Sequence, residues 1–317
     1  MMTKNQKIAI LVISSIVLII LFIIPGLTSD NYGYLLSRRL PKIVAIIITA
    51  VAIALSSTIF QTITNNRILT PSVLGLDSLY MLIQTTVVFV MGSTSTIVLN
   101  KNLNFLVTVG LMLIFSGILY KFLFKNENNN IMILLLVGLI LGTLFQSLSS
   151  FMQMMIDPNE FSHIQDKMFA SFNNINTNIL ILATVIVCGV AIYSFRYMKV
   201  LDVLSLGKDQ TINLGIDHDK VVKRMLFAVS ILVSVSTALV GPITFLGLLV
   251  VNLAREYLNT FEHKYLMITS SLMGIVALVG GQLLVERVFN FGTPISVIIN
   301  LVGGVYFIYL LLKENVA

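Results

Sequence analysis

The chain has 317 residues, of which 57% are hydrophobic and 11% charged, and its mean hydropathy is +0.96. This composition excludes a water-soluble domain, which needs a polar surface around its core. The formal net charge is +6, but the basic residues flank apolar segments and form no aromatic-interleaved patch, so no nucleic-acid partner is expected. We predict an all-α integral membrane protein with a single transmembrane domain over residues 1–317 and the lipid bilayer as its surroundings.

Apolar segments recur along the whole chain, bounded by charged residues, Pro, Gly or Asn. Crossing a hydrocarbon layer of ~30 Å takes roughly 20 apolar residues per helix. About ten spans are predicted in chain order: Ile8–Ile24, Ile43–Thr62, Leu74–Met91, Phe105–Phe122, Ile131–Met155, Ile179–Phe195, Val221–Val240, Ile243–Leu253, Leu266–Val285 and Pro294–Leu312. The eighth is short and follows Gly-Pro, which predicts a broken or tightly turned segment.

The first apolar segment has two interpretations. Lys4 and Lys7 precede it, as in a secretory signal, but it ends in Ile-Pro-Gly-Leu-Thr-Ser-Asp without a small-x-small cleavage pattern. A retained first span is therefore favoured over a cleaved signal. With the N-terminus inside, most of the 20 Lys and Arg residues fall on the inner side. The positive-inside rule then places both termini in the cytoplasm.

One polar stretch, Val200–Arg224, interrupts this apolar chain, and the same rule places residues 200–220 in the cytoplasm. Ser205 is expected to cap a short helix, Asp209 suits the positive end of its dipole, and Gly215 is expected to end it in a left-handed turn. An apolar contact surface is offered by Leu206, Ile212 and Leu214. We predict a short amphipathic helix that docks a cytosolic partner.

This stretch, "LDVLSLGKDQTINLGIDHDKVVKR", resembles the coupling loop of the FecCD family, the iron-siderophore and vitamin B12 permeases of bacterial ABC importers. Three further stretches resemble the family's motifs in the family's order: "RRLPKIVAIIITAVAIALSSTIFQTITNNRILTPSVLGLDS", "GPITFLGLLVVNLAR" and "GTPISVIINLVGGVYFIYLLLK". The chain departs from the family pattern at Arg67, which occupies the Pro of NPLA, and at Val251 and Asn252, which replace Pro-His.

The resemblance implies a permease that works as half of a homo- or heterodimer with the transport path at the dimer interface. It assigns ATPase coupling to Leu206, Asp209, Ile212, Leu214 and Gly215. The sequence has no G-x-x-x-x-G-K-[ST] motif, so the chain is expected to be non-catalytic and to use separate cytosolic ABC ATPase subunits. The expected cargo is a ferric siderophore; haem or cobalamin, and a secondary transporter, are the alternatives.

Four of the six basic residues on the predicted outer side are considered together: Arg38, Arg39, Lys42 and Arg287. They are consistent with interfacial anchors that reach the headgroups, and equally with docking of a substrate-binding protein through complementary charge. The resemblance favours docking, with Arg39 and Lys42 at the matched positions and Arg287 beside them.

Polar residues on two spans are candidates for the transport path, although plain packing is the alternative for each: Ser57, Gln61, Thr64, Gln146 and Gln153. The centres of the predicted spans carry such amides and hydroxyls instead of charged groups, which argues against an ion-coupled carrier. We expect no cofactor and no metal site. His163, His218 and His263 fall in three loops and are interpreted as solvated, and Cys188 is interpreted as buried packing.

Overall fold

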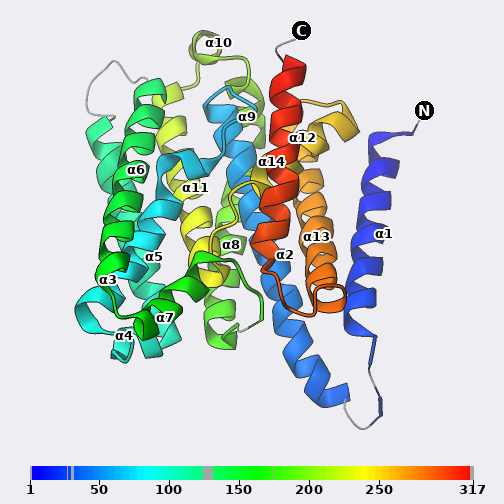
Figure 1. The fold of residues 1–317 in the computed structure, drawn as a ribbon. Helices are drawn as coiled ribbons and strands as arrows, with labels where there is room; N and C mark the ends of the chain where they lie inside the picture. Colours follow the sequence, from blue (N-terminus) through cyan, green and yellow to red (C-terminus); the bar gives the residue numbers. More distant parts are fainter. Residues whose placement is uncertain (1, 27, 30–31, 124–130, 174, 315–317) are drawn as a thin grey trace.

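The computed structural model describes residues 2–26, 28–29, 32–123, 131–173 and 175–314. Within these residues the chain is helical, without strands (Figure 1). The helices are α1 (Lys4–Ile23), α2 (Tyr32–Ile63), the 3-10 helix η1 (Pro71–Leu74), α3 (Leu76–Met91), α4 (Thr96–Leu99), α5 (Lys101–Leu123), α6 (Ile131–Met155), α7 (Pro158–Met168), α8 (Thr177–Arg196), α9 (Met198–Leu204), α10 (Lys208–Asn213), α11 (His218–Val240), α12 (Leu246–Leu258), α13 (His263–Arg287) and α14 (Ile295–Glu314).

The long helices run alternately up and down between two ends of the bundle (Figure 1). One end carries both ends of the chain together with α10 and is named the α10 end; the opposite end carries α4 and α7 and is named the α7 end. Of the described helices, 8 are long and apolar enough to cross a membrane, and α3 is a shorter apolar helix. The all-α membrane fold predicted from the sequence is therefore confirmed.

Two predicted spans differ from the observed helices. The second was expected to begin at Ile43, but α2 begins at Tyr32 and contains Pro41 in its interior. The basic residues Arg38, Arg39 and Lys42 lie within the helix and do not end it. The eighth span is broken as predicted: α12 begins at Leu246, after a non-helical connection that starts at Gly241 with φ +100°.

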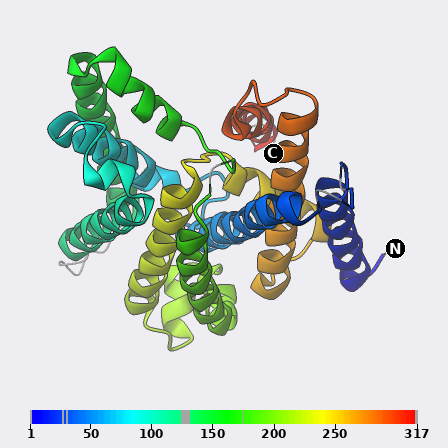
Figure 2. The same ribbon diagram turned by 90° about the horizontal axis from the view of Figure 1, so that it is seen from below.

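Helix α2 forms the centre of the bundle, with α11, α12 and α13 packed around it (Figure 2). The two buried apolar clusters of the described residues both include α2 side chains, such as Leu55 in one and Ala54 in the other. Small residues permit this central position. A Cβ atom on Gly274 of α13 would lie 3.2 Å from the Cβ of Ala50, and one on Gly247 of α12 would collide with Ser57. Helix backbones therefore approach α2 closely, as is common between membrane helices.

A second close approach fixes α6 against the turn between η1 and α3. Gly75 has φ +76°, and a Cβ on it would lie 2.9 Å from the carbonyl oxygen of Gly138 and 3.0 Å from the Cα of Gly142. Gly138 in turn faces the backbone of Val73 and Leu74. Because backbone meets backbone, neither side has a side chain that is able to move away.

We predict that Gly138→Ala destabilises the protein by about 1–3 kcal/mol, because its Cβ would lie 2.8 Å from the carbonyl oxygen of Val73. The matched control is Gly110→Ala on α5, where no atom lies within 4 Å of the added Cβ. That change should alter stability by no more than about 1 kcal/mol, in the stabilising direction. Size-exclusion profiles after heating in detergent measure both, and equal melting temperatures for the two variants would contradict the packing described here.

Candidate functional site

The polar stretch between α8 and α11 folds as two short helices at the α10 end. Helix α9 continues from α8, Gly207 turns the chain with φ +97°, and α10 follows as a helix of 6 residues. Gly215 has φ +80°, the left-handed turn that the sequence predicted, and Asp209 lies in the first turn of α10. Residues 197–217 therefore form one compact segment, named here the coupling segment.

The cap of α10 differs from the prediction. Gly207, not Ser205, occupies the N-cap position, and no side chain caps the helix there. Ser205 instead ends α9, where its hydroxyl donates to the carbonyl oxygen of Asp202 at 2.6 Å. Ser205 does not cap α10 because that helix begins at Lys208, and its N-cap position is residue 207, where φ +97° favours glycine.

The coupling segment presents apolar side chains outward. Leu206 is 60% exposed, Ile212 is 51% exposed and Leu214 is 60% exposed. Thr211, by contrast, is buried, and its hydroxyl donates to the carbonyl oxygen of Gly207 at 2.7 Å. The inward side of α10 is thus fixed by hydrogen bonds, while Leu206, Ile212 and Leu214 are exposed on and beside a helix whose other exposed residues are polar: Lys208, Asp209, Gln210 and Asn213.

A buried histidine connects the coupling segment to the centre of the bundle. Oδ1 of Asp202 accepts the backbone N–H of His263 at 2.8 Å and lies 2.7 Å from its ring Nδ1. The other ring nitrogen, Nε2, lies 2.7 Å from Oγ1 of Thr62 on α2. His263 is only 2% exposed. One imidazole therefore joins α9, the start of α13 and the end of α2.

The interpretation of the histidines as solvated is corrected for two of the three. His263 and His218 are buried, whereas His163 is exposed. Both buried histidines stand at the first residue of a long helix, where tertiary contacts cover them. Cys188 is likewise corrected, because it is exposed on the outer surface of α8 instead of packed inside.

The basic residues predicted on the outer side cluster at the α7 end of α2 and α13, and two of them have partners within the chain. Nζ of Lys42 lies 3.0 Å from Oε1 of Glu286, and both side chains are mostly buried. The guanidinium of Arg39 donates to the carbonyl oxygen of Pro25 at 2.7 Å. Arg38 lies over the ring of Tyr34, and Arg287 is exposed. Arg287 therefore offers a freer positive charge than Lys42.

The five path candidates occupy different places in the fold. Ser57 and Gln61 are buried in the centre, and the hydroxyl of Thr64 donates to the carbonyl oxygen of Phe60. Gln153 on α6 donates to the hydroxyl of Thr85 on α3 at 3.2 Å. Gln146 is exposed on α6. Within the described part of one chain, these five side chains do not line one common surface.

Two polar features were missed in the sequence. Helix α6 exposes a row of polar residues at helical spacing on its apolar surface: Thr143, Gln146, Ser147 and Ser150. Asp77, in the first turn of α3, borders a cavity of about 20 Å³ with Ser57 and Thr237, whose hydroxyl lies 3.4 Å from the carboxylate. The i, i+3, i+4, i+7 spacing of the row was readable from the sequence, and so was the acidic residue near the start of the third span.

The profile of the FecCD transport family matches residues 5–313. The chain belongs to this family. The petrobactin import system permease protein YclO of Bacillus subtilis (strain 168) is 62% identical over 314 residues, which cover 99% of each chain. The petrobactin import system permease protein FatC of Bacillus anthracis is 38% identical over 287 residues, which cover 90% of this chain and 81% of FatC.

A solved structure described as an inward-facing, metal-chelate type ABC transporter shares the fold of this FecCD permease with a TM-score of 0.85. The two are 22% identical, and the match covers 98% of this chain and 100% of the other. The fold is therefore shared at low sequence identity.

We predict that Asp202→Ala destabilises the FecCD permease by about 1–3 kcal/mol, because it leaves the backbone N–H and the ring of buried His263 without their acceptor. Asp209→Ala, an exposed change in the same segment, is the control and should cost less than about 1 kcal/mol. Melting temperatures in detergent measure both effects. An Asp202 variant as stable as its Asp209 counterpart would show that the imidazole contact contributes nothing.

Proposed function

We propose that this FecCD permease is the membrane subunit of an ABC importer that carries a ferric siderophore across the cytoplasmic membrane. The observation that carries the proposal is the 62% identity over almost the whole chain to a permease named for petrobactin import. FatC, which bears the same description, supports it at 38% identity. Relatives named for haemin and vitamin B12 match at 24% and 27% identity, so the siderophore cargo is favoured over these alternatives.

In this proposal the α10 end faces the cytoplasm, and both chain termini lie there. The positive-inside distribution of Lys and Arg supports this orientation. The coupling segment then meets a cytosolic ABC ATPase through the exposed surface of Leu206, Ile212 and Leu214, while Asp209 and Gly215 shape the helix that presents it. A movement of α10 is passed to the end of α2 and the start of α13 through Asp202, His263 and Thr62. ATP hydrolysis belongs to the partner.

The transport path is proposed to lie between two permease copies, or between this chain and a sister permease. Polar groups on a membrane helix face water or a partner in preference to lipid. The exposed row on α6, which includes Gln146, is therefore a wall of the path. Gln153 bonds to Thr85 on α3, Ser57 lies against Gly247 of α12, and the hydroxyl of Thr64 bonds to the end of its own helix. These three residues are assigned to packing next to the path instead of to its wall.

The α7 end is proposed to dock an extracellular or periplasmic binding protein. Arg287 is exposed there and supplies the steering charge, whereas Arg39 and Lys42 shape the surface through their contacts within the chain.

Uptake by a strain that lacks this gene tests the cargo and the coupling together. The wild-type gene should restore uptake of at least one radiolabelled ferric siderophore and should have no effect on the uptake of haem, cobalamin or free iron salts.

The variant Ile212→Asp with Leu214→Asp should reach the membrane at normal levels but lose both uptake and co-purification with the ATPase, because charge replaces the apolar contact surface. Leu99→Asp, an exposed change at the α7 end, is the control. Restoration of cobalamin uptake alone would refute the iron assignment and keep the importer.

Charge reversal tests the outer face. Arg287→Glu should weaken association with the ligand-loaded binding protein more at low salt than at high salt, since exposed charges are screened over ~10 Å at 0.1 M. Lys42→Gln should instead lower the melting temperature, because it leaves the mostly buried Glu286 without its ammonium partner. Binding to permease in nanodiscs across a salt series measures the first effect. A loss that does not depend on salt would exclude electrostatic docking at Arg287.

A further inference from the structure

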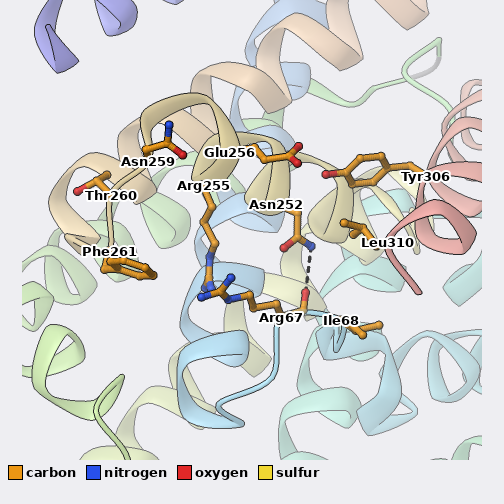
Figure 3. Close-up of a pocket in the computed structure, with 10 residues that line it drawn as sticks. All are labelled: Arg67, Ile68, Asn252, Arg255, Glu256, Asn259, Thr260, Phe261, Tyr306 and Leu310. Carbon is orange, nitrogen blue, oxygen red and sulfur yellow. Dashed lines mark hydrogen bonds between the residues drawn. The ribbon is translucent and has the colours of Figure 1, made fainter. Parts of the chain in front are cut away.

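The α10 end of the FecCD permease contains a cavity of about 400 Å³ that none of the roles above uses. It lies between the end of α12, the connection after α2, and α14 (Figure 3). Arg67 enters it from the connection and Arg255 from the last turn of α12. Figure 3 shows the two guanidinium groups directed at one another on the same side of the cavity.

Local contacts hold the two arginines in this arrangement. Nδ2 of Asn252 donates to the carbonyl oxygen of Arg67 at 3.0 Å, which ties the connection to α12. The guanidinium of Arg67 stacks on the ring of Phe261, 5.8 Å from its centroid. Asn252 and Arg67 are both positions at which the chain departs from the family motifs, so the departures meet at one site.

The positive charge of this pair is not neutralised by ion pairs within the described part of the chain. Glu256 lines the same cavity, but Figure 3 shows its carboxylate turned toward Tyr306 and away from the guanidinium groups. Arg67 is exposed and Arg255 is half-buried, and two like charges held close together repel one another. An anion between them removes that repulsion.

Unsatisfied donors lie at the same place. Among the described residues, Nε of Arg255 is buried without a hydrogen-bond partner, and so are both amide atoms of Gln61 on α2. A second cavity of about 150 Å³ is lined by Gln61, Arg67 and Arg255. The arginine pair therefore stands between two cavities, with a buried amide on its inner side. Buried polar groups of this kind are normally hydrogen-bonded.

We propose that Arg67 and Arg255 form a binding site for an oxyanion, a carboxylate or phosphate group, with the amide of Gln61 as a further donor. The planar guanidinium group offers paired N–H donors that match the two oxygens of such a group. The site is independent of which chelate is transported. The oxyanion belongs either to a soluble compound that enters from the α10 end or to a phospholipid headgroup, and the two sources share this chemistry.

Thermal stability of the permease with its ATPase in nanodiscs tests the proposal. In phosphatidylcholine nanodiscs, citrate or inorganic phosphate should raise the melting temperature by about 2 °C or more relative to chloride at equal ionic strength. A rise that instead requires phosphatidylglycerol in the nanodisc identifies a lipid headgroup as the source. The absence of a rise with all three probes would overturn the proposal.

Variants separate a binding site from a structural one. Arg67→Gln should be at least as stable as wild type in chloride, because it relieves the repulsion, and should lose the rise produced by the anion. Arg67→Lys keeps the charge but removes the paired N–H donors of the guanidinium, and it should lose most of the rise in melting temperature. Lys121→Gln removes an exposed charge from the last turn of α5, at the same end, and should keep all of it. An undiminished rise in Arg67→Gln would also overturn the proposal.

Discussion

The close packing of helices around α2 is the constraint on which the rest of the structure depends. From Ala45 to Ile63, α2 is largely covered by its neighbours, and it is held there by van der Waals contact and hydrogen bonds with them. Gly247 and Gly274 bring α12 and α13 against its backbone, and Ala50 and Ser57 leave room for them. Both buried clusters include side chains of this helix, so both parts of the core pack against it.

The ends of α2 carry the functional contacts for that reason. At the α10 end, Thr62 meets His263, and the connection that follows brings Arg67 to Arg255. At the α7 end, Lys42 pairs with Glu286 of α13. Each contact joins α2, or the connection that follows it, to α12 or α13.

The sequence predicted what local pattern determines. The lengths of the apolar segments predicted the membrane helices, and the Gly-Pro pair predicted the broken start of α12. Gly215 predicted a left-handed turn, and its φ is +80°. It did not predict partners that lie far along the chain. Lys42 and Glu286 are 244 residues apart, and Thr62 and His263 are 201 residues apart. No periodicity within a helix reports such pairs, so a histidine at a helix start was interpreted as solvated and a lysine as a free docking charge.

The exposed row on α6 was missed for a different reason. Its spacing was visible, but polar residues in a membrane helix serve packing and water contact equally well, and only burial separates the two. The structure separates Gln146, which is exposed, from Gln153, which bonds to Thr85. Sequence reasoning grouped them as path residues because it lacked that distinction.

The central position of α2 also has a consequence for biogenesis. The helix leaves the ribosome second, but α11, α12 and α13, which cover it, follow only from residue 218 onward. At a synthesis rate of about 5–20 residues per second, α2 waits on the order of 10–30 seconds for its neighbours. During that time Thr49, Ser56 and Gln61, buried in the finished protein, face lipid or the insertion machinery. Membrane insertion of this chain is therefore completed late, when α11 to α13 close over α2.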